Sequence, residues 1–135
     1  MAIKLPVLLR NTRADTFTTR IGASGLLRIY SGTQPTDADT AIGAQVLLAQ
    51  LTCGATFAAA AATGVLTANA ITSANAAATG VATWFRLVNA GATVNVTDGT
   101  VTATGSGGDL QLVTTSITSG QPVQVTALTI TEGGA

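Results

Sequence analysis

The spacing of apolar residues changes along the chain from a helical pattern to an alternating one. Within residues 11–22, apolar side chains recur at three- and four-residue intervals, which predicts a short amphipathic helix. The residues that set this spacing are Ala14, Phe17 and Ile21. Asn11 or Thr12 can cap the start of such a helix, and Gly22 can end it.

Beyond residue 25, apolar and polar residues alternate, as they do in strands with one buried face. In LLRIYS, residues 26–31, Leu27 and Ile29 share one face. Comparable runs follow, separated by Gly, Asn or Ser; they are AQVLLAQLT (44–52), ATFAAAAAT (55–63), VLTANAIT (65–72), VATWFRLVN (81–89), SGGDLQLVTT (106–115) and PVQVTALTIT (122–131). We therefore expect about eight short strands in an antiparallel β-sandwich or jelly roll.

Two local features refine this expectation. The pair Asp98-Gly99, flanked by alternating valines and threonines, predicts a tight hairpin turn. In the last run the apolar phase slips between Val125 and Leu128, which predicts a β-bulge.

Length and charge suggest how the chain is organised. A chain of 135 residues fits one domain. Five cations and one acid give the first 28 residues a local net charge of +4, whereas five acids and one cation give the remainder −4. We expect residues 1–25 to form a basic N-terminal arm with the short helix, and residues 26–135 to form the β-sandwich domain.

Arg86 is the one charge in the run VATWFRLVN. In a strand, Trp84 and Arg86 point to one side and Phe85 points to the other, so we expect Phe85 in the core. Arg86 would then lie on an exposed sheet face with its stem against Trp84, or both residues would form a subunit contact. If the register were shifted by one residue, Arg86 would instead lie inward, paired with an acid such as Asp98 or Asp109.

The residue types present offer little catalytic chemistry. The chain has no histidine to activate a serine, and Cys53 has no cysteine partner for a disulfide. We expect no enzymatic activity, no catalytic or metal-binding residues and no cofactor. The apolar stretch in MAIKLPVLLR is too short for a signal peptide, and polar residues interrupt the uncharged residues 40–85 too often for a membrane helix.

The basic arm has three possible roles. Arg10, Arg13 and Arg20 could stay solvated, could dock on another protein or could contact phosphates. Phe17, the aromatic residue among them, takes a core-facing helical position, so base stacking is poorly supported and we expect no nucleic-acid partner. The candidate interface residues are Arg10, Arg13, Phe17, Arg20, Trp84 and Arg86.

Three stretches resemble a known group of proteins. They are RNTRADTFTTRIGASGLLRIYSGTQPTDADTA (10–41), ATGVATWFRLVNAGATVNVTDGTV (78–101) and GGDLQLVTTSITSGQPVQVTALTIT (107–131). Together they are similar to small structural proteins of tailed-bacteriophage virions, most closely the decoration or cementing proteins of the capsid exterior. The phrases LRIYSGTQP and ATWFRL carry most of this resemblance.

The resemblance implies a virion protein, made in the bacterial cytoplasm, that forms homodimers or homotrimers over junctions between major capsid protein subunits. It would clamp the shell against internal pressure, with no membrane partner. A phage tail, baseplate or fibre component shares this composition and remains the alternative.

Overall fold

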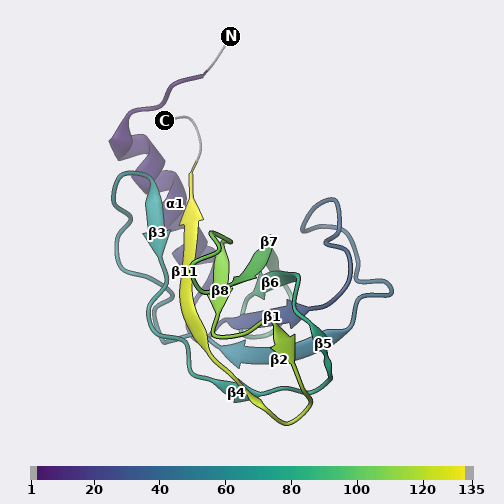
Figure 1. Ribbon diagram of the computed structural model, residues 1–135. Helices are drawn as coiled ribbons and strands as arrows, with labels where there is room; N and C mark the ends of the chain where they lie inside the picture. The colour runs from purple at the N-terminus through teal and green to yellow at the C-terminus, as the bar shows by residue number, and fades with distance from the viewer. Residues whose placement is uncertain (1–2, 133–135) are drawn as a thin grey trace.

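The computed structural model describes residues 3–132, which form one helix and a set of short strands around a common core (Figure 1). The helix, α1, spans Val7–Ile21. The strands are β1 (Leu26–Tyr30), β2 (Leu47–Thr52), β3 (Val65–Thr67), β4 (Ala74–Asn75), β5 (Gly80–Val81), β6 (Trp84–Val88), β7 (Asn95–Ala103), β8 (Leu110–Leu112), β9 (Ser116–Ile117), β10 (Pro122–Val123) and β11 (Val125–Thr131).

Seven of these strands form one mixed sheet in the order β2-β1-β6-β7-β8-β11-β3. Its pairs are antiparallel except for β7 and β8, which run parallel. Two-stranded ladders of β10 with β4 and of β5 with β9 complete the β structure. Figure 1 shows β1 and β2 running across the direction of β3 and β11, so the sheet curls on itself. The expected fold class, mainly β in a sandwich-like arrangement with an N-terminal helix, is confirmed.

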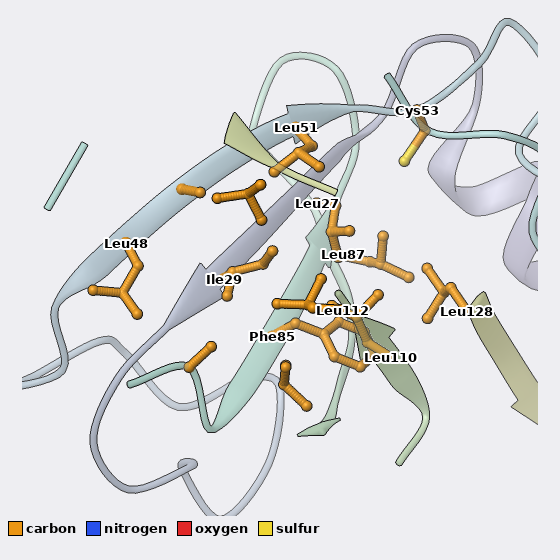
Figure 2. Packing of buried hydrophobic residues seen from close by; sticks show 14 of the residues in the cluster. Leu27, Ile29, Leu48, Leu51, Cys53, Phe85, Leu87, Leu110, Leu112 and Leu128 are labelled. Atoms are coloured by element: carbon orange, nitrogen blue, oxygen red, sulfur yellow. The ribbon is translucent and has the colours of Figure 1, made fainter. Parts of the chain in front are cut away.

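The core fills the inside of this curl. Leu27 and Ile29 of β1 and Phe85 of β6 face the same interior as Leu110 of β8 and Leu128 of β11 (Figure 2). Each of these side chains is at most 2% exposed. The alternation in LLRIYS and VATWFRLVN therefore predicted the buried face of β1 and β6 correctly.

Helix α1 begins four residues earlier than Asn11, the first of the two expected caps, because VLL directly after Pro6 can take helical geometry. The side chain of Asn11 instead accepts a hydrogen bond from the backbone N–H of Gly64 at 2.7 Å. The predicted end is confirmed, since Gly22 follows the helix with a φ of 71° that favours glycine.

The predicted turn at Asp98-Gly99 is wrong, because both residues lie inside strand β7. Gly99 pairs with Phe85 of β6, and a Cβ on Gly99 would lie 2.5 Å from the Phe85 ring. The glycine is thus required by packing against an aromatic ring. The chain reverses at residues 89–94, where Asn89 Oδ1 accepts backbone N–H groups of Thr93 and Val94 at 2.8 and 3.1 Å.

The strand expected at residues 55–63 is also wrong. This segment is irregular and makes only the isolated bridges Ala58–Ala68 and Ala62–Val65. Alanine has little preference for a pleated surface, and Phe57, at 1% exposure, anchors the segment in the core without a ladder. By contrast, the predicted bulge is confirmed as a register shift between Val125 and Ala127 where β11 pairs with β8.

Candidate interaction surfaces

Both faces of strand β6 are buried. Phe85 and Leu87 belong to the core, as the alternation predicts, while Trp84 and Arg86 lie on the opposite face. That face is covered by the long connection of residues 31–46. Arg86 is consequently only 3% exposed, so the expectation of an exposed or subunit-facing Arg86 is wrong.

Arg86 is held by a bidentate ion pair. Its Nε and Nη2 donate to the two carboxylate oxygens of Asp98 on the neighbouring strand at 2.6 and 2.8 Å. Asp98 is directly opposite Arg86 in the ladder of β6 and β7. The hydrogen bond to Asp98 raises the pKa of Arg86 above its ordinary value against the opposing effect of burial, so this guanidinium stays charged.

The remaining donors of Arg86 fix the covering connection. Nη1 donates to the backbone carbonyl of Thr40 at 2.9 Å, and Nη2 donates to that of Asp37 at 3.3 Å. Asn95 of β7 adds a hydrogen bond to the carbonyl of Ala38 at 2.9 Å. Arg86 thus links β6 to β7 and to the connection 31–46. The planar guanidinium, with its five N–H donors, is suited to such a role.

Trp84 lies beside this ion pair and is fully buried. Its ring stacks on Tyr30 of β1, with centroids 4.5 Å apart and planes 12° from parallel, and the guanidinium carbon of Arg86 lies 5.5 Å from the indole centroid. Its Nε1 has no hydrogen-bond partner among the described residues. Trp84 and Arg86 therefore form a second, smaller cluster inside the chain and do not form a surface.

The helix carries the other candidate residues, and Arg10 is the most enclosed of them at 9% exposure. Its Nη1 donates to the carbonyl of Thr63 at 3.2 Å, and its side chain packs against Gly64. Asp15, one turn later, accepts the backbone N–H of Ala61 at 2.7 Å. The polar side of α1 is thus used to bind the segment 61–64, and Arg10 belongs to this internal contact.

Arg13, Phe17 and Arg20 have different surroundings. Arg13 pairs with Glu132 at 2.7 Å but remains 52% exposed, and Phe17 is half-buried against the core. Arg20 is exposed. Of the six candidate interface residues, only Arg13 and Arg20 are on the open surface of the described chain.

The helix also contributes Ala14 and Ile21, at 0% and 1% exposure, to the core. Helix α1 therefore shares a core with the strands that follow it.

Sequence reasoning missed an exposed apolar cluster at the start of the helix, called here the apolar tip. It consists of Ile3 (74% exposed), Val7 (46%), Leu8 (78%) and Leu9 (44%). The signal in the sequence is the apolar run LPVLL, residues 5–9. Figure 1 shows this end of α1 projecting past the edge of the sheet.

Comparison with protein-family models, with curated proteins and with solved structures finds no match. Within residues 3–132, no helix combines the length and apolar character needed to cross a membrane. The same part of the chain contains no group of three or more His, Cys, Asp or Glu side chains placed to hold a metal ion.

Cys53 is a buried free thiol, and its burial raises the pKa from 9.0 to about 11. We expect a thiol reagent at pH 8 to label the folded protein far more slowly than the urea-unfolded protein.

Between about pH 9 and pH 11 the unfolded chain loses a thiol proton that the folded chain keeps, so Cys53 should lower the free energy of unfolding as pH rises. Urea unfolding of wild type and Cys53→Ala across this range measures the effect; parallel pH profiles for the two proteins would contradict it.

Proposed function

We propose that this chain is a virion structural protein of a tailed bacteriophage, which binds the outside of the assembled capsid and cements junctions between major capsid protein subunits. The resemblance of residues 10–41, 78–101 and 107–131 to capsid decoration proteins supports this proposal. Its partners are the major capsid protein and further copies of itself, as a dimer or trimer, and its location is the capsid exterior. No enzymatic step, cofactor or nucleic acid is needed.

The observation that carries the proposal is the apolar tip. Three successive side chains of one helical turn, Val7, Leu8 and Leu9, are each at least 44% exposed, and Ile3 precedes them. Single exposed apolar residues are ordinary, but four of them within residues 3–9, at one end of a helix, indicate a contact site for another protein. Burying these four side chains against a partner would supply a favourable hydrophobic contribution to attachment.

The helix that carries the tip is firmly held. Ala14 and Ile21 anchor it in the core, and Arg10, Asn11 and Asp15 bind the segment 61–64. A contact that is already ordered loses less conformational entropy on binding than a flexible arm would. Arg20 places an exposed positive charge at the far end of the same helix, which favours an acidic group on the partner's surface.

The test is co-sedimentation of the purified protein with shells of the phage's major capsid protein from which the decoration layer is absent. We expect Leu8→Ser to weaken binding at least tenfold, because Leu8 is the most exposed residue of the tip, while the free energy of unfolding changes little. Val113→Ser is the matched control, since Val113 is 58% exposed but lies after β8, away from the tip in sequence. Equal binding of wild type and Leu8→Ser would refute the role of the tip.

A further inference from the structure

A cavity of about 230 Å³ lies between α1 and the sheet. Its walls come from the helix, from β6, β7 and β11, and from the loop before β8. The residues that line it are Phe17, Phe85, Thr97, Asp98, Asp109, Thr129, Ile130 and Thr131. The partly exposed Phe17 ring, the buried Phe85 ring, three threonines and the exposed Asp109 carboxylate thus border one space.

Gly99, in the middle of strand β7, lies against Phe85 and Asp109, two of the residues that line this cavity. A Cβ on Gly99 would lie 2.5 Å from Phe85 Cε1 and 3.1 Å from Asp109 Oδ2. The Phe85 ring therefore occupies the space beside Gly99 that a side chain would fill, and the Asp109 carboxylate lies next to the same space. Glycine inside a strand commonly marks such a close approach.

The carboxylate of Asp109 is held in place by a hydrogen bond but forms no ion pair within residues 3–132. Its Oδ2 accepts the backbone N–H of Thr100 at 3.2 Å, and its backbone carbonyl accepts that of Thr129 at 3.0 Å. The ion pairs of residues 3–132 are Arg13–Glu132 and Arg86–Asp98, so Asp109 has no cationic partner there. Most of its acceptor capacity remains available to a ligand.

These groups together suit a cation on an apolar stem. A carboxylate forms charge-assisted hydrogen bonds with an ammonium or guanidinium group. The partly exposed Phe17 ring can attract a cation and pack against methylene groups, and threonine hydroxyls accept further hydrogen bonds. The volume of about 230 Å³ exceeds the roughly 150 Å³ of an engineered cavity that holds benzene. We propose that this cavity receives the cationic end of a lysine or arginine side chain from a partner protein, with Asp109 as the recognising carboxylate.

This inference does not depend on attachment to a capsid, and the isolated protein tests it. The probes are n-butylammonium and ethylguanidinium, followed by amide NMR at constant ionic strength. We expect saturable shifts of the Gly99, Thr100 and Asp109 signals with both probes. The neutral isostere 1-butanol should bind at least tenfold more weakly, because it lacks the charge that Asp109 recognises.

Asp109→Asn should weaken both cationic probes about tenfold while the shape of the cavity is kept, which corresponds to about 1.4 kcal/mol. Asp39→Asn is the matched control, because Asp39 is an exposed carboxylate in the connection 31–46, and it should leave binding unchanged. The proposal is overturned if the three signals do not move in the wild type, if 1-butanol binds as well as n-butylammonium, or if Asp109→Asn binds like the wild type. The comparison of 1-butanol with n-butylammonium stands even if Asp109→Asn is poorly folded.

Discussion

Replacing Arg86 by alanine is expected to lower the free energy of unfolding by about 3–5 kcal/mol, because it leaves Asp98 as an unpaired buried carboxylate. The side chains of Arg86 and Asp98 are each 4% exposed, so the carboxylate is shielded from bulk water in the folded protein. The carbonyls of Asp37 and Thr40 would lose their donors at the same time. Urea unfolding followed by Trp84 fluorescence measures this change.

Two further variants separate the ion pair from a general effect of losing an arginine. Arg20→Ala removes an exposed guanidinium and should change stability by no more than about 0.5 kcal/mol. The double variant Arg86→Met, Asp98→Leu should be less destabilised than the sum of the two single changes, because neither charge is left alone. A cost below about 1 kcal/mol for Arg86→Ala would mean that the connection 31–46 does not exclude water from this pair.

Trp84→Ala should cost about as much as Phe85→Ala, on the order of 3–5 kcal/mol each, although the two side chains point to opposite faces of β6. Trp84 is 0% exposed and Phe85 is 1% exposed. Removal of the indole would also end its stacking on Tyr30, where the centroids are 4.5 Å apart. Thermal or urea unfolding of both variants, followed by circular dichroism, gives the comparison.

A conservative change tests the same cluster more finely. Trp84→Phe should cost clearly less than Trp84→Ala, because a phenyl ring can still stack on Tyr30 and the indole Nε1 has no hydrogen bond to lose among the described residues. Val113→Ala is the control for loss of an exposed apolar side chain and should be nearly neutral. If Trp84→Ala unfolds like the wild type, the stacked cluster is not part of the folded core.

The alternation of residues was sufficient to predict which side chains of β1 and β6 share a face, because successive side chains of a strand point to opposite sides. It could not show that the second face of β6 is also covered. The connection 31–46 binds Arg86 through backbone carbonyls. Every residue type has such a carbonyl, so the sequence does not identify these contacts. A single arginine between apolar residues, with an aspartate twelve positions later, was the available signal, but it fits an exposed face equally well.

The failures at Asp98-Gly99 and at residues 55–63 share a cause. Local preference favours a turn at the first site, but Asp98 is held by Arg86 and Gly99 by the Phe85 ring, both from the neighbouring strand. At the second site, the anchor Phe57 and the hydrogen bond from Ala61 to Asp15 fix a segment with no partner strand along its length. Contacts from distant parts of the chain decide both conformations, and a pattern read along the sequence does not contain them.

One other assignment would use the same exposed side chains of the apolar tip. A component of the phage tail, baseplate or fibre could use the same exposed side chains to bind a different protein. The two assignments differ in copy number, because a capsid surface repeats its subunit junctions many times, whereas a tail part is present in few copies.

The most direct test of the proposed function compares cryo-electron microscopy maps of tailed-phage particles assembled with this chain and without it. Our account predicts density for the β-sandwich repeated over the outer face of the capsid, with helix α1 directed toward the shell and Leu8 in contact with the major capsid protein. Density confined to the tail, or identical capsid surfaces with and without the protein, would contradict it.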